Sequence, residues 1–104
     1  MKILRDFQGL AIRLTDERLA HILEHPEMAG MEPAIEVTLL RPERVVESFS
    51  DPAARLYYRF YVGTQVGDKY LCVIVKVRET DAFVLTAYLT DKIKRGVQLW
   101  PKEN

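Results

Sequence analysis

The segment Lys69–Thr90, KYLCVIVKVRETDAFVLTAYLT, decides the fold of this chain. Two apolar runs rich in Val, Leu and Tyr flank the polar stretch RETDA, and this pattern predicts an antiparallel β-hairpin. Placing Val77 opposite Phe83 sets a register whose other cross-strand pairs are Val75 with Leu85, Val73 with Ala87, and Leu71 with Leu89. This register predicts one continuous apolar face that forms a wall of the core.

The other face of the predicted hairpin is semi-polar. It carries Cys72, Ile74 and Lys76 from the first strand and Val84, Thr86 and Tyr88 from the second. A sheet with one apolar and one mixed face is typical of a fold in which helices cover one side. We therefore expect a substrate or partner to bind on the mixed face.

The chain before the hairpin predicts a short strand, two helices and two more strands. Thr15 is a helix N-cap, and Pro26 and Pro42 disfavour helical geometry in the residues before them. The expected elements are a strand at Leu10–Leu14, helices at Asp16–Glu24 and Pro33–Leu40, and strands at Arg44–Phe49 and Arg55–Val62. The predicted fold is a single α+β domain over residues 1–104, with two N-terminal helices packed on one face of a four- to five-stranded antiparallel meander sheet.

The composition narrows the classes of function. The 104 residues carry 15 basic and 15 acidic side chains, so binding of nucleic acid through a high net charge is excluded, although a local basic patch is not. No apolar run approaches the roughly 20 residues of a membrane helix. Cys72 is the only cysteine and lies inside an apolar run, so we expect a buried thiol, no disulfide and a cytoplasmic location.

His21 and His25 are four residues apart at the first predicted helix, so they project from one side of it. Three interpretations are open: two solvent-facing side chains, a general acid–base pair, or a pair of metal ligands. A zinc site needs further ligands, and the sequence has no other histidine to supply one. We therefore predict neither metal nor cofactor, and we treat both histidines as candidate catalytic residues.

Lys76 stands in the middle of the apolar run VIVKV. A lysine in such a strand must either extend to solvent or meet an anion, and the anion can be a phosphate or a developing negative charge. Thr86 and Tyr88 are common in strands for their propensity alone, but on one face they also place two hydroxyls within reach of one ligand. Lys76, Thr86 and Tyr88 are therefore candidate catalytic residues.

The segment YYRFYV offers a second group of candidates. Tyr58, Phe60 and Val62 form its more apolar set, so we expect them to face the core. The alternate residues would then share the face of Lys76, where an arginine flanked by tyrosines can hold a phosphate while the rings stack on bases. The alternative interpretation is that these residues only form an ordinary, solvent-exposed face of the sheet. The predicted substrate-binding residues are Tyr57, Arg59 and Tyr61.

Several segments together resemble the barnase–EndoU–colicin–RelE-like group of phage- and toxin-associated, ribonuclease-like domains. The resemblance spans about residues 13–100, and its most specific parts are HILEHPE and TAYLTDKIKRG. The other segments that carry it are LTDERLAHILEHPEM, TLLRPERVVESFSD, YYRFYV, KYLCVIVKV and LW.

The resemblance implies a metal-independent ribonuclease in which the ribose 2′-OH attacks the adjacent phosphate. A helix histidine, His21 or His25, would transfer protons, and Lys76 and Arg59 would steady the phosphorane. Thr86 and Tyr88 would supply the hydroxyls of the last strand. RNA is then the expected substrate. Other possible partners are an antitoxin or immunity protein, and a second copy of the chain paired through a free strand edge. The alternative is a non-catalytic module that binds nucleic acid or protein.

Overall fold

The computed structural model of the protein describes residues 1–102. Its elements in chain order are β1 (Lys2–Arg5), β2 (Ala11–Leu14), α1 (Asp16–Leu23), a 3₁₀ turn (Pro26–Met28), α2 (Glu32–Leu40), β3 (Arg44–Ser48), β4 (Ala54–Thr64), β5 (Gly67–Arg78), β6 (Asp81–Thr90) and β7 (Gly96–Trp100).

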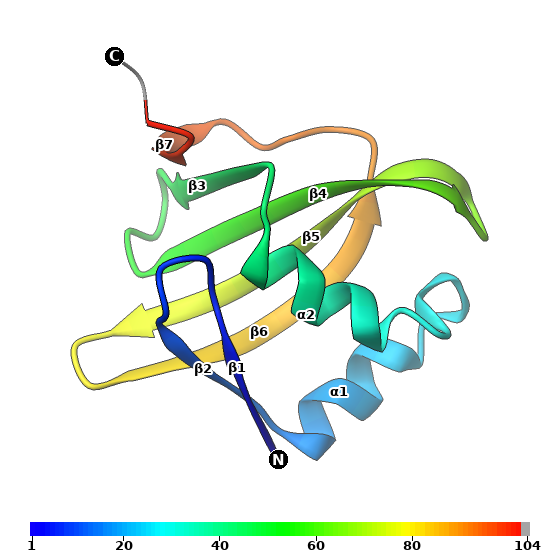
Figure 1. Ribbon diagram of the computed structural model, residues 1–104, viewed down its shortest axis with the longest axis horizontal. Coiled ribbons are helices and arrows are strands. Elements are labelled where there is room, and N and C mark those ends of the chain that lie inside the picture. Colours follow the sequence, from blue (N-terminus) through cyan, green and yellow to red (C-terminus); the bar gives the residue numbers. More distant parts are fainter. Residues whose placement is uncertain (103–104) are drawn as a thin grey trace.

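The strands form one mixed sheet, so the predicted meander of four or five antiparallel strands is wrong. The sheet has seven strands in the order β1-β2-β6-β5-β4-β3-β7. All neighbours pair antiparallel except β2 and β6, which pair parallel through Arg13 and Phe83. Only the central run β3–β6 follows the predicted order, and three shorter strands extend it on both sides (Figure 1).

These added strands are four or five residues long, which explains why their local pattern is weak. A strand of this length forms because an existing edge offers unpaired N–H and C=O groups. β2 joins the edge of β6, and β1 then pairs with β2. β7 pairs with β3 at the other end, so the outer edges of the sheet are β1 and β7.

The β5–β6 hairpin has the predicted register over half of its length. Val73 lies opposite Ala87 and Leu71 opposite Leu89, as expected. A bulge follows Ile74, and beyond it Val75 pairs with Val84 instead of Leu85, and Val77 with Ala82 instead of Phe83. The extra residue in β6 turns Val84 into the core, where it is buried, whereas the sequence predicted it on the mixed face.

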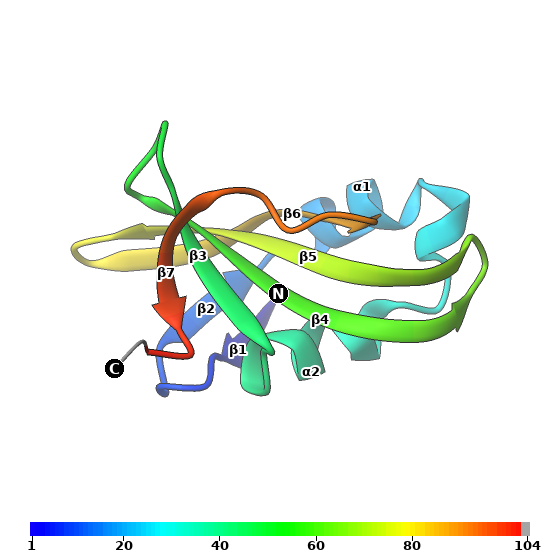
Figure 2. The ribbon, with the colours of Figure 1, turned by 90° about the horizontal axis from the view of Figure 1, so that it is seen from above.

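The main core lies between the helices and one face of the sheet. Ile22 of α1 and Ile35 and Leu39 of α2 are buried in one cluster with the inward side chains of the strands. These include Leu71, Val73, Val75, Val45, Tyr57, Val84 and Ala87. Figure 2 shows α2 beneath the sheet and α1 beside β6, so the two helices occupy different positions against this core.

A second, smaller cluster covers part of the opposite face, which we call the helix-free face. It contains Val46, Leu56, Tyr58 and Cys72, with Ile93 packed against them. Ile93 lies in the segment between β6 and β7, which runs over this face (Figure 2). The thiol of Cys72 is fully buried, as predicted. Within residues 1–102, no helix is long and apolar enough to cross a membrane.

Candidate functional site

The strand register places Lys76, Thr86 and Tyr88 together on the helix-free face, as the sequence predicted. Thr86 lies opposite Ile74, and Tyr88 lies opposite Cys72. Lys76 follows Ile74 by two positions on β5, so all three side chains project from the same side. Thr86 is half-buried and Tyr88 is 37% exposed, which leaves both hydroxyls on an accessible part of the sheet.

Tyr88 is a hydrogen-bond donor at neutral pH. Partial burial raises the pKa of Tyr88 to about 12, and the nearby thiol of Cys72 adds to the effect. Burial also raises the pKa of Cys72 to about 11, so the thiol beneath the ring stays neutral. The phenol therefore keeps its proton and can donate it in a hydrogen bond to an anionic oxygen.

Lys76 already has an anionic partner. Its ammonium group forms an ion pair with Asp51, which lies in the turn between β3 and β4. The hydrogen bond from Lys76, followed by one from the backbone N–H of Ala53, lowers the pKa of Asp51. A phosphate that approaches Lys76 would share the cation with this carboxylate.

Helix α1 carries His21 and packs against β6. Thr15 caps the helix by accepting a hydrogen bond from the N–H of Arg18 at 3.1 Å, and Ile22 anchors it in the core. The side chain of His21 is 61% exposed, and its Nδ1 lies 3.6 Å from a carboxylate oxygen of Glu24. His21 therefore stands on the outer surface of a fixed helix.

The helix advances in the same direction as β6 and lies alongside it (Figures 1 and 2). Arg13 pairs with Phe83, and two extended residues take the chain about 7 Å further, to Thr15. Six helical residues then add about 9 Å to reach His21. The path from Arg13 to His21 is therefore about 16 Å long, and it starts beside Phe83 of β6.

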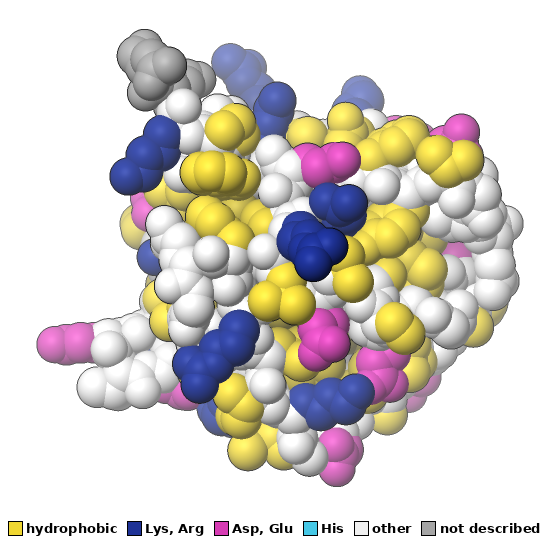
Figure 3. Space-filling view, viewed as in Figure 1, with side chains coloured by type: hydrophobic (Ala, Val, Ile, Leu, Met, Phe, Trp, Pro, Cys, Tyr) yellow, Lys and Arg dark blue, Asp and Glu magenta, His cyan; other side chains and the backbone are white. Residues whose placement is uncertain are grey.

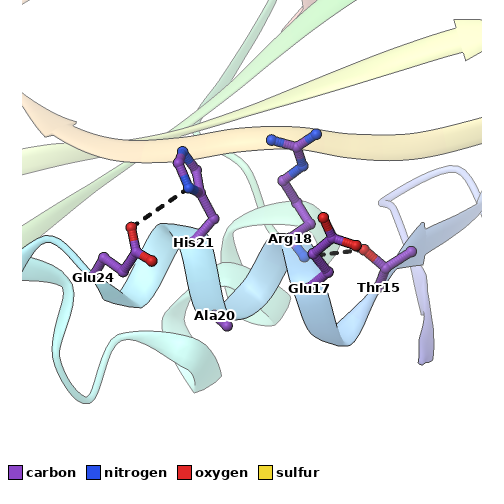
Figure 4. Close-up of a pocket in the computed structure, with 6 residues that line it drawn as sticks. All are labelled: Thr15, Glu17, Arg18, Ala20, His21 and Glu24. Carbon is purple, nitrogen blue, oxygen red and sulfur yellow. Dashed lines mark hydrogen bonds and ion pairs between the residues drawn. The ribbon is translucent and has the colours of Figure 1, made fainter.

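A shallow hollow of about 450 Å³ follows this helix, lined by Thr15, Glu17, Arg18, Ala20, His21 and Glu24. Figure 4 shows the side chains of Arg18 and His21 rising from α1 to the ribbon of β6. Figure 3, which views the α2 side, shows no histidine among the described residues, although His21 and His25 are 61% and 63% exposed. The exposed imidazoles therefore do not lie on the α2 side.

We call the group of Arg18 and His21 from α1 with Thr86 and Tyr88 from β6 the α1–β6 seam. Arg18 was not predicted as a site residue. Its spacing of three residues from His21 was the available signal, because residues at this spacing share one side of a helix. The seam places a guanidinium and an imidazole on α1 next to the strand that carries the two hydroxyls.

His25 lies beyond α1, at the start of the 3₁₀ turn. Its Nδ1 is 3.8 Å from a carboxylate oxygen of Glu27, so the two histidines lie nearest to different acids. Among residues 1–102, no hydrogen bond or ion pair joins either histidine to Lys76, Thr86 or Tyr88. In the same range, no three His, Cys, Asp or Glu side chains are grouped to hold a metal ion.

The predicted face of Tyr57, Arg59 and Tyr61 is wrong. Tyr57 lies opposite Val73, and Arg59 lies opposite Leu71, so these residues project toward the helices.

Their polar groups bond within the protein. Tyr57 is fully buried, and its hydroxyl donates to Asp6 Oδ2 at 2.7 Å. Arg59 Nη1 donates to the carbonyl of Arg41 at 2.7 Å, and the Tyr61 hydroxyl donates to the carbonyl of Ala34 at 3.2 Å.

The alternate residues of β4 do not form the main core either. Tyr58 belongs to the second cluster, and Phe60 and Val62 are 42% and 78% exposed. The hydroxyl of Tyr58 accepts a hydrogen bond from the N–H of Lys94 at 3.0 Å. The aromatic side chains that strands β4, β5 and β6 place on the helix-free face are therefore Phe60, Tyr70, Phe83 and Tyr88, with Tyr58 beneath.

No family model matches the chain, and neither a curated protein nor a solved structure matches it.

Proposed function

We propose that the protein is a metal-independent endoribonuclease whose reaction takes place at the α1–β6 seam. The observation that carries this proposal is the position of α1, which packs beside β6 and carries the exposed side chain of His21 together with Arg18. An imidazole and a guanidinium on α1 then lie next to the strand that carries Thr86 and Tyr88, and Lys76 lies on the same sheet face, about 13 Å along β5 from the residue opposite Tyr88.

The chemistry follows from these groups. The imidazole of His21 accepts the proton of the ribose 2′-OH while the 2′-oxygen attacks the neighbouring phosphorus. The bond from phosphorus to the 5′-oxygen breaks, and the 5′-oxygen takes a proton from water. The products are a 2′,3′-cyclic phosphate and a 5′-hydroxyl, and His21 then releases its proton to the solvent. Tyr88 keeps its proton near neutral pH, so it can donate a hydrogen bond to a phosphoryl oxygen.

Arg18 supplies positive charge near the reacting phosphate, and Lys76 supplies it for a neighbouring phosphate of the same RNA strand. Arg18 stands on the same side of α1 as His21, and Lys76 shares the sheet face with Thr86. Lys76 must exchange part of its interaction with Asp51 for one with the phosphate. That exchange offsets part of the gain, so Lys76 contributes less to binding of the strand than an unpaired lysine would.

The test is cleavage of a labelled single-stranded RNA in EDTA. We expect the wild type to cleave, and we expect His21→Ala to lower the rate by about 10²- to 10⁴-fold, which is the usual contribution of a general base. Lys76→Ala should raise KM more than it lowers kcat, because it removes a cation that binds the strand beside the reacting linkage. Lys69→Ala is the matched control, since Lys69 is also on β5 and also pairs with an aspartate, Asp91.

Equal cleavage by the wild type, His21→Ala and Lys76→Ala would refute the proposal, because a shared contaminant would then explain the activity. Cleavage that requires an added metal ion would refute the metal-independent mechanism. The variant His25→Ala distinguishes the roles of the two histidines. A larger loss of cleavage rate in His25→Ala than in His21→Ala would assign the proton transfer to His25.

The second candidate function is RNA binding without cleavage. The ion pair between Lys76 and Asp51 favours it, because a paired lysine is less available to a reacting phosphate. Tight binding of RNA that stays intact, with Tyr70→Ala and Tyr88→Ala weakening the binding, would support this function over catalysis.

A further inference from the structure

A second hollow opens on the helix-free face, where β3 meets the segment before β7. It has a volume of about 300 Å³, and its lining includes Arg44, Phe49, Lys94 and Arg95. No carboxylate of the described residues lines it, and none of its three cations forms an ion pair within residues 1–102. In a chain with no net charge, this is a local concentration of positive charge.

The segment that carries two of these cations is held on the sheet. The N–H of Lys94 donates to the hydroxyl of Tyr58, and Ile93 packs on the second cluster. At Gly96 a side chain would have its Cβ only 2.3 Å from the carbonyl oxygen of Glu47, so the backbone lies directly against β3. The backbone that carries these cations is therefore already in place before a ligand binds, and only the side chains need to be ordered.

The hollow and the seam lie at two ends of one row across the sheet. Arg44 pairs with Tyr58, Tyr58 with Cys72, and Cys72 with Tyr88. Residues directly opposite one another share a face, and three strand spacings separate Arg44 from Tyr88 by about 14 Å. A single phosphate cannot contact both ends, whereas a strand of several nucleotides can.

We propose that this hollow binds the phosphodiester backbone of single-stranded RNA, several residues along the strand from the linkage held at the α1–β6 seam. This inference rests on the proposed function, because it takes its ligand from the reaction. The ring of Phe49, which is 70% exposed at the hollow, offers a surface on which a base stacks. An acidic peptide has no base to stack there, so RNA fits the lining better.

The experiment measures binding without cleavage. A fluorescent single-stranded RNA with 2′-O-methyl groups lacks the attacking hydroxyl, so its affinity can be measured by anisotropy at several salt concentrations. The test variant is Arg44→Gln with Lys94→Gln. The control is the double variant Lys2→Gln with Arg41→Gln, which removes the same amount of charge at a different place, next to α2. Lys2 forms an ion pair with Glu32 of α2, and Arg41 is the C-cap of the same helix.

We expect the test variant to bind more weakly and the control to bind like the wild type. Each lost phosphate contact lowers the slope of log K against log salt by about 0.7, so the test variant should lose about 1.4 from the slope. Phe49→Ala should weaken binding without changing the slope.

Equal slopes for the wild type, the test variant and the control would overturn the inference, and so would no binding by the wild type. Displacement of the RNA by poly-glutamate at equal charge concentration would assign the hollow to acidic proteins and also overturn it. If binding follows the expected pattern but unmodified RNA is never cleaved, the hollow stands and the proposed catalytic function fails.

Discussion

Replacement of Tyr57 by Phe tests how the N-terminal loop is held to the centre of the sheet. Tyr57 is fully buried, and its hydroxyl donates to Asp6 Oδ2 at 2.7 Å. Asp6 is 2% exposed, and its other oxygen accepts hydrogen bonds of 2.9 Å from the backbone N–H groups of Gln8 and Leu10. The substitution removes one of three hydrogen bonds to a buried carboxyl and leaves the ring in place.

The expected cost is about 2 kcal/mol. A hydrogen bond to a charged group contributes about 1.5–3 kcal/mol, and the two remaining N–H donors prevent the carboxyl of Asp6 from losing all its partners. For a domain of this size, 1 kcal/mol shifts the melting temperature by about 4 °C, so Tyr57→Phe should melt about 8 °C lower.

Chemical denaturation in urea, followed by circular dichroism, measures this loss. Tyr61→Phe is the control, since the hydroxyl of Tyr61 donates to the neutral carbonyl of Ala34 and is only half-buried. Its loss should cost about 0.5–1.5 kcal/mol. A free energy of unfolding for Tyr57→Phe no lower than that for Tyr61→Phe would refute the structural role given to the Asp6–Tyr57 bond.

Three further predictions concern Gly96, Cys72 and Asp81. Gly96→Ala should lower the free energy of unfolding by about 1–3 kcal/mol, because the new Cβ meets the backbone of Glu47; an unchanged urea midpoint would contradict this contact. Cys72, fully buried and with its pKa raised to about 11, should react with a thiol reagent at pH 8 only after denaturation, and fast reaction of the native protein would contradict that burial. The hydrogen bond from Arg13 lowers the pKa of Asp81, so this pair stabilises the fold above the unfolded pKa of about 3.9 and loses its effect as the pH falls through the lower folded value. The difference in urea midpoint between the wild type and Asp81→Asn should therefore be present at pH 7 and shrink as the pH falls toward 2, and a difference that does not shrink would contradict this role.

The sequence predicts the central strands because their local pattern is strong. β5 and β6 are long apolar runs around a polar turn, and the pairs Leu71–Leu89 and Val73–Ala87 follow from matching their apolar faces. The bulge after Ile74 could not be predicted in this way, because an apolar residue fits either face there and Leu85 and Val84 exchange without a change in polarity.

Which residues of β4 face the helices could not be predicted from the local pattern, for a different reason. This strand packs against apolar clusters on both sides, so alternation does not identify the inner face. The residue that decides it is Asp6, which bonds to Tyr57 from 51 positions away in the chain. Tyr57 can be buried on the helix side because the carboxyl group of Asp6 accepts the hydrogen bond of its hydroxyl there.

The candidate site could be predicted in part. Lys76, Thr86 and Tyr88 share a face because strand periodicity is reliable where the register is right. The place of His21 depends on the parallel pairing of β2 with β6, which rests on one residue pair, Arg13 with Phe83. No pattern in a four-residue strand indicates such a partner, so the position of α1 beside β6 had to come from the structure.

The central claim is that RNA is cleaved by attack of its own 2′-OH at the α1–β6 seam. The most direct measurement is mass spectrometry of the fragments formed in EDTA from an RNA and from the same RNA with one 2′-deoxynucleotide before the main cleavage point. We expect 2′,3′-cyclic phosphate ends from the first RNA, no cut at the modified position of the second, and at least about 10²-fold slower formation of fragments with His21→Ala. Linear phosphate ends together with a cut at the deoxynucleotide would contradict it.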